Sequence, residues 1–74
     1  MPDTKVFSEL NAVVWKIEVA VGDRVNAGDT LIILESMKME IPVVTEVPGV
    51  VRELHVAPEQ TVQEGDLIAL IDES

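Results

Sequence analysis

The feature of this sequence that most constrains its fold is an internal repeat, offset by 37 residues. The segment VVWKIEVAVGDRVNAGDTLIILE (residues 13–35) aligns without a gap on VVRELHVAPEQTVQEGDLIALID (residues 50–72). Several valines recur at identical positions, and so does a Gly-Asp pair that begins at Gly28 in one copy and at Gly65 in the other. Apolar and turn residues that repeat together at one offset indicate two copies of a single supersecondary unit.

Each copy has the pattern of short β-strands separated by tight turns. In WKIEVAV, the apolar Ile17, Val19 and Val21 alternate with the residues between them, and a period of two is typical of a half-buried strand. The Gly-Asp pairs favour tight turns, and Pro48-Gly49 suits the central positions of a type II turn. No segment shows the apolar spacing of a helix. The pattern predicts strands near residues 5–10, 13–21, 24–26, 30–35, 39–46, 50–57, 61–63 and 67–72.

The repeat also predicts the fold class. Because neither copy can bury its apolar face alone, we expect one all-β domain over residues 1–74, with halves of about 1–37 and 38–74. Its two four-stranded antiparallel sheets would close on each other as a flattened barrel or sandwich, related by a pseudo-twofold axis. The offset pairs Lys38 with the chain ends, so we expect Lys38 at the tip opposite the termini.

Composition excludes several classes of function. The chain has no cysteine and one histidine, which rules out disulfides, thiolate chemistry and a histidine-rich metal site. Its formal net charge of −9 disfavours nucleic acid and anionic membranes as partners. The first ten residues contain no long apolar run, so we expect no signal peptide, no membrane span and a cytoplasmic protein that is a monomer in isolation.

No residue outside the centre of the chain is a strong candidate for catalysis. His55 matches Glu18 across the repeat and is expected on an outward strand face, and Trp15 matches Arg52 and is expected as a partly exposed edge residue. Pro42 suits an edge strand or a bulge. No arrangement of a nucleophile beside a base is apparent, so we do not expect an enzyme.

The stretch ESMKME (residues 35–40) joins the two copies. Met37 and Lys38 suit the two central positions of a tight hairpin, yet neither is the glycine, asparagine or aspartate that primed turns prefer. A lysine at a hairpin tip is commonplace, but an exposed pair of methionines gains nothing from water. This choice of residues therefore indicates selection by a partner. Glu35 and Glu40 are most simply solvated strand ends, and orientation of a partner surface through charge is the alternative.

ESMKM, together with the preceding GDTLIILE, Gly49 and the closing EGDLIALI, resembles a biotinyl/lipoyl attachment domain. The resemblance covers essentially the whole chain and is strongest to the stand-alone, thumbless attachment proteins related to biotin carboxyl carrier proteins. It implies a barrel-sandwich hybrid fold with biotin joined to Lys38 through an amide. It also implies a recognition collar of Met37 and Met39 for the biotin protein ligase, with Glu35, Ser36 and Glu40 as candidate ligase contacts.

The resemblance implies a non-catalytic carrier that moves carboxyl groups between a biotin carboxylase and a carboxyltransferase. Lipoyl-bearing relatives usually have aspartate before the lysine and alanine after it, whereas Met37 and Met39 stand here and favour biotin. Ser36 stands where many biotin carriers have alanine. Two alternatives stay open from the sequence, namely a lipoylated carrier of acyl or aminomethyl groups and an unmodified interaction module.

Overall fold

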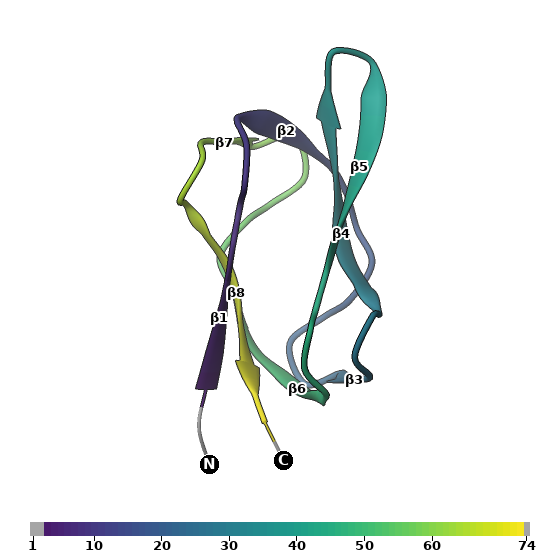
Figure 1. Ribbon diagram of the computed structural model, residues 1–74, viewed down its shortest axis with the longest axis vertical. Coiled ribbons are helices and arrows are strands. Elements are labelled where there is room, and N and C mark those ends of the chain that lie inside the picture. The colour runs from purple at the N-terminus through teal and green to yellow at the C-terminus, as the bar shows by residue number, and fades with distance from the viewer. Residues whose placement is uncertain (1–2, 74) are drawn as a thin grey trace.

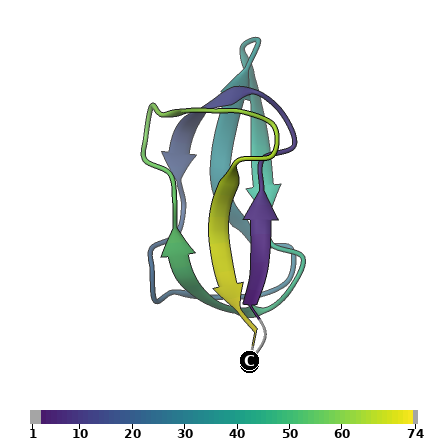
Figure 2. The same ribbon diagram turned by 90° about the vertical axis from the view of Figure 1, so that its left-hand side faces the viewer.

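The computed structural model describes residues 3–73, which form eight strands and no helix. The strands are β1 (Asp3–Phe7), β2 (Ala12–Ile17), β3 (Arg24–Val25), β4 (Thr30–Ser36), β5 (Met39–Val44), β6 (Gly49–Leu54), β7 (Thr61–Val62) and β8 (Leu67–Asp72). They make two antiparallel four-stranded sheets, which we call sheet A (order β1-β8-β6-β3) and sheet B (order β5-β4-β2-β7). The sheets face each other as two layers (Figure 2). The predicted fold class is confirmed.

The two halves of the repeat are interlaced. At an offset of 37 residues, β1, β2, β3 and β4 fall on β5, β6, β7 and β8, so the strand order of sheet A maps onto that of sheet B. Each sheet takes two strands from each half. The repeat predicts which strands are equivalent, and the structure adds that equivalent strands lie in opposite sheets. Neither half therefore contains a complete sheet.

The core between the sheets is thin and almost wholly aliphatic. Its fully buried large side chains come mainly from the two long central strands, with Leu31, Ile32 and Leu34 on β4 and Ile68 and Ile71 on β8. A fully buried side chain of this size contributes about 1.5–3 kcal/mol relative to an exposed one. In the absence of disulfides, this packing supplies most of the stabilisation.

Two buried hydroxyl groups end β1 and β5 earlier than the sequence pattern predicts. Ser8 donates from Oγ to the carbonyl oxygen of Leu10 at 2.6 Å, and its repeat partner Thr45 donates from Oγ1 to the carbonyl oxygen of Val47 at 2.7 Å. Both hydroxyls also accept a backbone N–H from the same residue that they donate to. These local hydrogen bonds turn the chain out of the sheet, because a hydroxyl offers the backbone an alternative to the ladder.

The expected strand over residues 13–21 is wrong in its second half. β2 ends at Ile17, and Val21 is 61% exposed instead of inward. The N–H of Asp23 donates to the carbonyl oxygen of Ala20, and a carboxylate oxygen of Asp23 accepts the N–H of Ala20 at 2.9 Å. Val21 therefore lies in a closed turn ahead of Gly22, whose φ of 98° is in the left-handed region.

The expectation of a type II turn at Pro48-Gly49 is also wrong. Gly49 does not have a positive φ, which that turn requires at its second central position. It begins β6 instead, buried against β8. A Cβ at Gly49 would lie 2.3 Å from the carbonyl oxygen of Asp72, so glycine is needed here for close backbone approach.

The molecule is elongated, with extents of 36 × 18 × 18 Å. The β4–β5 hairpin protrudes at one end (Figure 1), and β1 begins beside the last residues of β8 at the other, where Asp3 is the register partner of Asp72. Lys38 is therefore at the end opposite the first and last described residues, as predicted. Met1, its repeat partner, lies outside the described residues. Residues 3–73 contain no helix capable of crossing a membrane.

Candidate attachment site at the β4–β5 hairpin

The tip of the hairpin is a two-residue turn. Ser36 on β4 is the register partner of Met39 on β5, which leaves Met37 and Lys38 as the loop. Their φ angles are 53° and 66°, so both residues are left-handed, as in a type I′ turn. That conformation costs an ordinary residue about 1–2 kcal/mol. The hairpin thus has the favoured turn geometry but not the residues that adopt it most readily.

The tip presents its side chains to solvent. Met37 is 91% exposed, Met39 is 65% exposed, and Lys38 between them is exposed as well. Among residues 3–73, the structure gives the Lys38 amine no ion pair and no hydrogen bond. Two exposed thioethers flanking an accessible amine contribute nothing to the core. Their arrangement suits contact with another protein, because methionine adapts to varied apolar surfaces.

Two carboxylates face each other one step below the turn. Glu35 on β4 and Glu40 on β5 are direct register partners, and both are exposed. Like charges that lie directly opposite each other destabilise a strand pair. Neither carboxylate makes an ion pair within the described part of the chain. The half-buried Ser36 lies between this acidic pair and the turn.

The base of the hairpin is anchored in the core. Leu34, fully buried on β4, pairs with Val14 on one side and with Ile41 on the other. The protruding tip is therefore held by a packed three-stranded segment of sheet B. An exposed primary amine on such a support fits the covalent attachment of a cofactor through an amide, with no pocket needed to hold it. Sequence reasoning missed this anchor, although Val14 and Leu34 recur in the second half as Val51 and Ile71.

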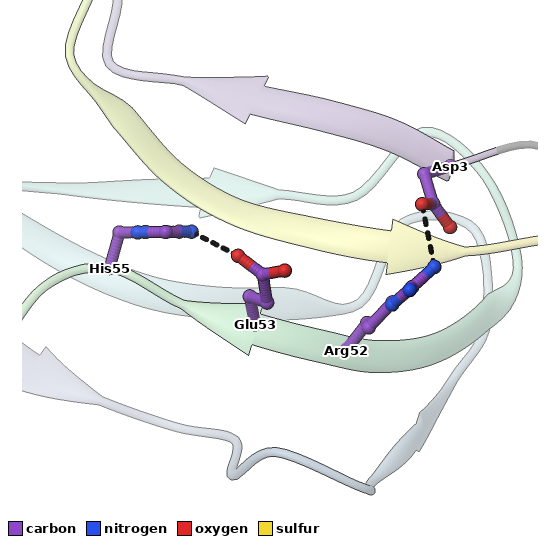
Figure 3. Close-up of polar contacts among 4 residues, drawn as sticks. All are labelled: Asp3, Arg52, Glu53 and His55. Carbon is purple, nitrogen blue, oxygen red and sulfur yellow. Dashed lines mark hydrogen bonds and ion pairs between the residues drawn. The ribbon is translucent and has the colours of Figure 1, made fainter.

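The other sequence candidates lie away from the hairpin tip. His55 is exposed as predicted and follows the end of β6. Its Nε2 lies 2.7 Å from Oε1 of Glu53, and the two side chains point toward each other (Figure 3). Pro42 is on β5, an edge strand of sheet B, as one of its two expected placements required. Trp15 is partly exposed as predicted. Its strand β2 lies between β4 and β7, but β7 pairs only with Ala12 and Val13, so Trp15 lies beyond that pairing.

Comparison with known proteins identifies the family. The model of the family described as "Biotin-requiring enzyme" matches residues 1–71. The biotinylated protein TB7.3 homolog of Mycobacterium leprae is 47% identical over 66 residues, which are 89% of this chain and 93% of that protein. The biotin/lipoyl attachment protein of Bacillus subtilis is 42% identical over 60 residues, covering 81% of this chain and 82% of that protein.

A solved structure extends the comparison to a large enzyme. The crystal structure of the urea carboxylase of Kluyveromyces lactis superposes with a TM-score of 0.91 at 38% identity over 97% of this chain. The matched part is 6% of that protein. The chain therefore belongs to the biotin-requiring family, as its resemblance implied. It is a non-catalytic, biotin-requiring carrier domain homologous to the carrier domains of carboxylases.

Proposed function

We propose that Lys38 carries biotin through an amide bond and that the chain transfers carboxyl groups between a biotin carboxylase and a carboxyltransferase. The observation that carries the proposal is the position of Lys38 at the apex of a protruding primed turn, between two exposed methionines. The fold contributes a rigid support, and the chemistry of carboxyl transfer belongs to the cofactor and to the partner enzymes.

Attachment requires one reaction of this chain's own side chain. Formation of the amide requires Nζ of Lys38 to lose a proton, and we assign removal of that proton to the biotin protein ligase. The amine then attacks the activated carboxyl carbon of biotin, an amide bond forms, and the activating group leaves. Met37 and Met39 would be the apolar collar that the ligase reads, with Glu35, Ser36 and Glu40 as further contacts.

The Lys38 side chain and the biotin joined to it would together act as a flexible arm on a rigid hairpin. Biotin, once attached, supplies a ring nitrogen that carries the carboxyl group from one active site to another. The four methylene groups of the Lys38 side chain lengthen the arm and rotate about their bonds, while β4 and β5 keep its base in place. Tethering keeps the cofactor at high effective concentration near either active site. We further propose a cytoplasmic location, with access to ATP and bicarbonate, and a monomeric carrier.

The proposal is tested by the intact mass of the protein after incubation with biotin, ATP and a biotin protein ligase. The wild type is expected to gain one biotinyl group, and Lys38→Arg none. The chain offers a matched control in Lys16→Arg, which removes another exposed lysine and should leave the gain unchanged. A biotinyl gain that persists in Lys38→Arg would refute Lys38 as the site.

The same measurement on protein from its own host separates the alternatives. A lipoyl increment at Lys38 would indicate a lipoylated carrier. Protein from a host with active ligases that carries no modification would contradict the carrier proposal and indicate an interaction module.

A further inference from the structure

The outer faces of the two sheets differ, although the repeat makes them equivalent strand for strand. On sheet A, Arg52 of β6 forms an ion pair with Asp3 of β1, with 2.8 Å between Nη1 and Oδ2 (Figure 3). The equivalent positions on sheet B hold Trp15 of β2 and Glu40 of β5. The sheet that carries the hairpin thus has an exposed indole in place of a surface ion pair.

A β-bulge brings each of these side chains to the surface. Val14 pairs with Leu34 and Lys16 with Ile33, so Trp15 is the extra residue of the bulge on β2. Arg52 is the extra residue of the equivalent bulge on β6. Bulges re-aim a side chain and are over-represented beside functional sites. An arginine in this position can stay hydrated, whereas a tryptophan that is 49% exposed leaves much apolar surface in water.

The indole is part of a larger apolar strip that begins at the base of the hairpin. Val13, also exposed, lies two residues before Trp15 and is the register partner of Glu35. Ile33 and Pro42 form a cross-strand pair beside it. The strip therefore continues directly from the acidic pair Glu35 and Glu40 under the Lys38 turn.

An interface of standard size would extend beyond the hairpin. Typical complexes bury about 800 Å² and about 20–30 residues on each side. The hairpin from Glu35 to Glu40 has only six residues, and the whole molecule exposes 4634 Å². A partner that binds around Lys38 with an interface of this size would cover part of one sheet face as well. Aromatic side chains dominate the energy of such contacts, which favours the face with Trp15.

We propose that the outer face of sheet B, centred on Trp15, docks the biotin protein ligase, an inference that rests on the proposed attachment of biotin to Lys38. The matching ligase surface would be an apolar pocket bordered by basic residues that face Glu35 and Glu40. The ligase is the partner that most needs this face, because it meets the chain before any cofactor arm is attached. Later partners gain binding energy and effective concentration from the tethered arm itself.

The internal repeat supplies the test. Trp15→Arg gives sheet B the residue that sheet A already accommodates, and Arg52→Trp is the reciprocal control. With purified ligase, biotin and ATP, we expect Trp15→Arg to raise the KM for the carrier about tenfold or more with kcat little changed. Arg52→Trp should behave as wild type. Trp15→Gln, which adds no charge, should give the same direction of change, and circular dichroism with thermal melting checks that each variant is folded.

A second variant tests the basic border of the ligase surface. Glu40→Gln removes one carboxylate of the acidic pair beneath the turn. We expect it to lower kcat/KM severalfold at low salt and to flatten the decline of kcat/KM with ionic strength, because complementary charges act mainly on the association rate. An unchanged salt dependence would overturn this part of the proposal.

The outcomes distinguish failure of the docking face from failure of the carrier function. If wild type and both Trp15 variants are biotinylated with the same KM, sheet B is not the ligase face, and Lys38 remains the attachment site. If those variants are biotinylated normally but are poor substrates for a biotin carboxylase, the face belongs to that enzyme and the ligase assignment is wrong. If wild type accepts no biotin at all, the proposed function itself fails.

Discussion

The duplicated framework of the barrel and the hairpin that joins its halves follow opposite rules. At two equivalent turns of the framework, the N–H of Gly28 donates to the carbonyl oxygen of Thr45 at 2.7 Å, and the N–H of Gly65 donates to the carbonyl oxygen of Ser8 at 2.8 Å. Both glycines have the positive φ that glycine tolerates best. In the hairpin, Met37 and Lys38 occupy conformations that glycine or asparagine would adopt more easily. The two framework turns thus have residues that suit their backbone, whereas the hairpin turn has residues that do not.

The largest effect is expected where the framework leaves no room. Gly49→Ala would place a Cβ 2.3 Å from the Asp72 carbonyl oxygen and 3.0 Å from Cγ2 of Ile71, so β6 and β8 must move apart. We expect a loss of about 3 kcal/mol in the free energy of unfolding, measured by urea titration. Ala12→Gly, at the equivalent position of the first half, should cost only about 1 kcal/mol. Equal losses at the two positions would contradict this account.

The next largest loss in the free energy of unfolding is expected at the buried hydroxyls that turn the chain out of the sheets. Thr45→Val keeps the shape but removes the Oγ1 that accepts the N–H of Val47 at 3.2 Å and donates to its carbonyl. A buried unsatisfied backbone group costs about 1–3 kcal/mol, so we expect a loss of about 2 kcal/mol in urea unfolding. Thr45→Ser retains the hydroxyl, as Ser8 does in the first half. A serine variant as unstable as the valine variant would refute the role of the hydroxyl.

The hairpin should respond in the opposite direction. Replacing Met37 by Asn and Lys38 by Gly gives the turn its preferred residues. We expect the double variant to gain about 1 kcal/mol in unfolding free energy, because two unfavourable left-handed conformations are relieved. It should accept no biotin. Lys38→Arg is the control, since it loses the acceptor amine but keeps the turn, and its melting temperature should match wild type. A destabilised double variant would show that Met37 and Lys38 support the fold.

The smallest change in unfolding free energy is expected at two equivalent turn positions of the framework, one of which is not a glycine. Glu59 has a φ of 69°, and its repeat partner Gly22 has a φ of 98°. Glu59→Gly should stabilise the protein by about 0.5 kcal/mol, since relief of the left-handed conformation is partly offset by the greater chain entropy of glycine. Gly22→Ala, which creates the reverse mismatch, should lower the unfolding free energy by about 1 kcal/mol. Differential scanning calorimetry on both variants checks the signs, and a loss in Glu59→Gly would contradict the strain argument.

Much of the architecture could be predicted from the sequence, because the repeat shows which strands of the two halves are equivalent. The equivalence of Val13 with Val50 places every strand of one half on a strand of the other, and the observed strands follow that equivalence. The exchange of strands between sheets could not be predicted, because a repeat identifies equivalent segments but not their hydrogen-bonded neighbours. The requirement for Gly49 also comes from packing against β8, which a local turn pattern cannot reveal.

The candidate site, too, could be predicted from the sequence only in part. The mismatch between ESMKME and its turn was visible in the sequence, because turn preferences are local. The asymmetry of the outer faces was visible only as a substitution of Trp15 for Arg52. The effect of this difference on the two surfaces could be described only once the bulge at Trp15 and the Arg52–Asp3 ion pair were known. Both depend on contacts between residues far apart in the chain.

The interlaced sheets also affect when the β4–β5 hairpin gains its full support during synthesis. β8 is an interior strand of sheet A and contributes Ile68 and Ile71 to the core. Its partners β1 and β6 precede it in the chain, and β1 by most of the sequence. Folds that depend on such distant pairings form late and slowly. A nascent chain whose residues beyond β5 are still inside the ribosome would expose Met37, Lys38 and Met39 without the support of a closed barrel. The modification that we propose at Lys38 is therefore expected to follow release of β8, and so to act as a check that the carrier has folded.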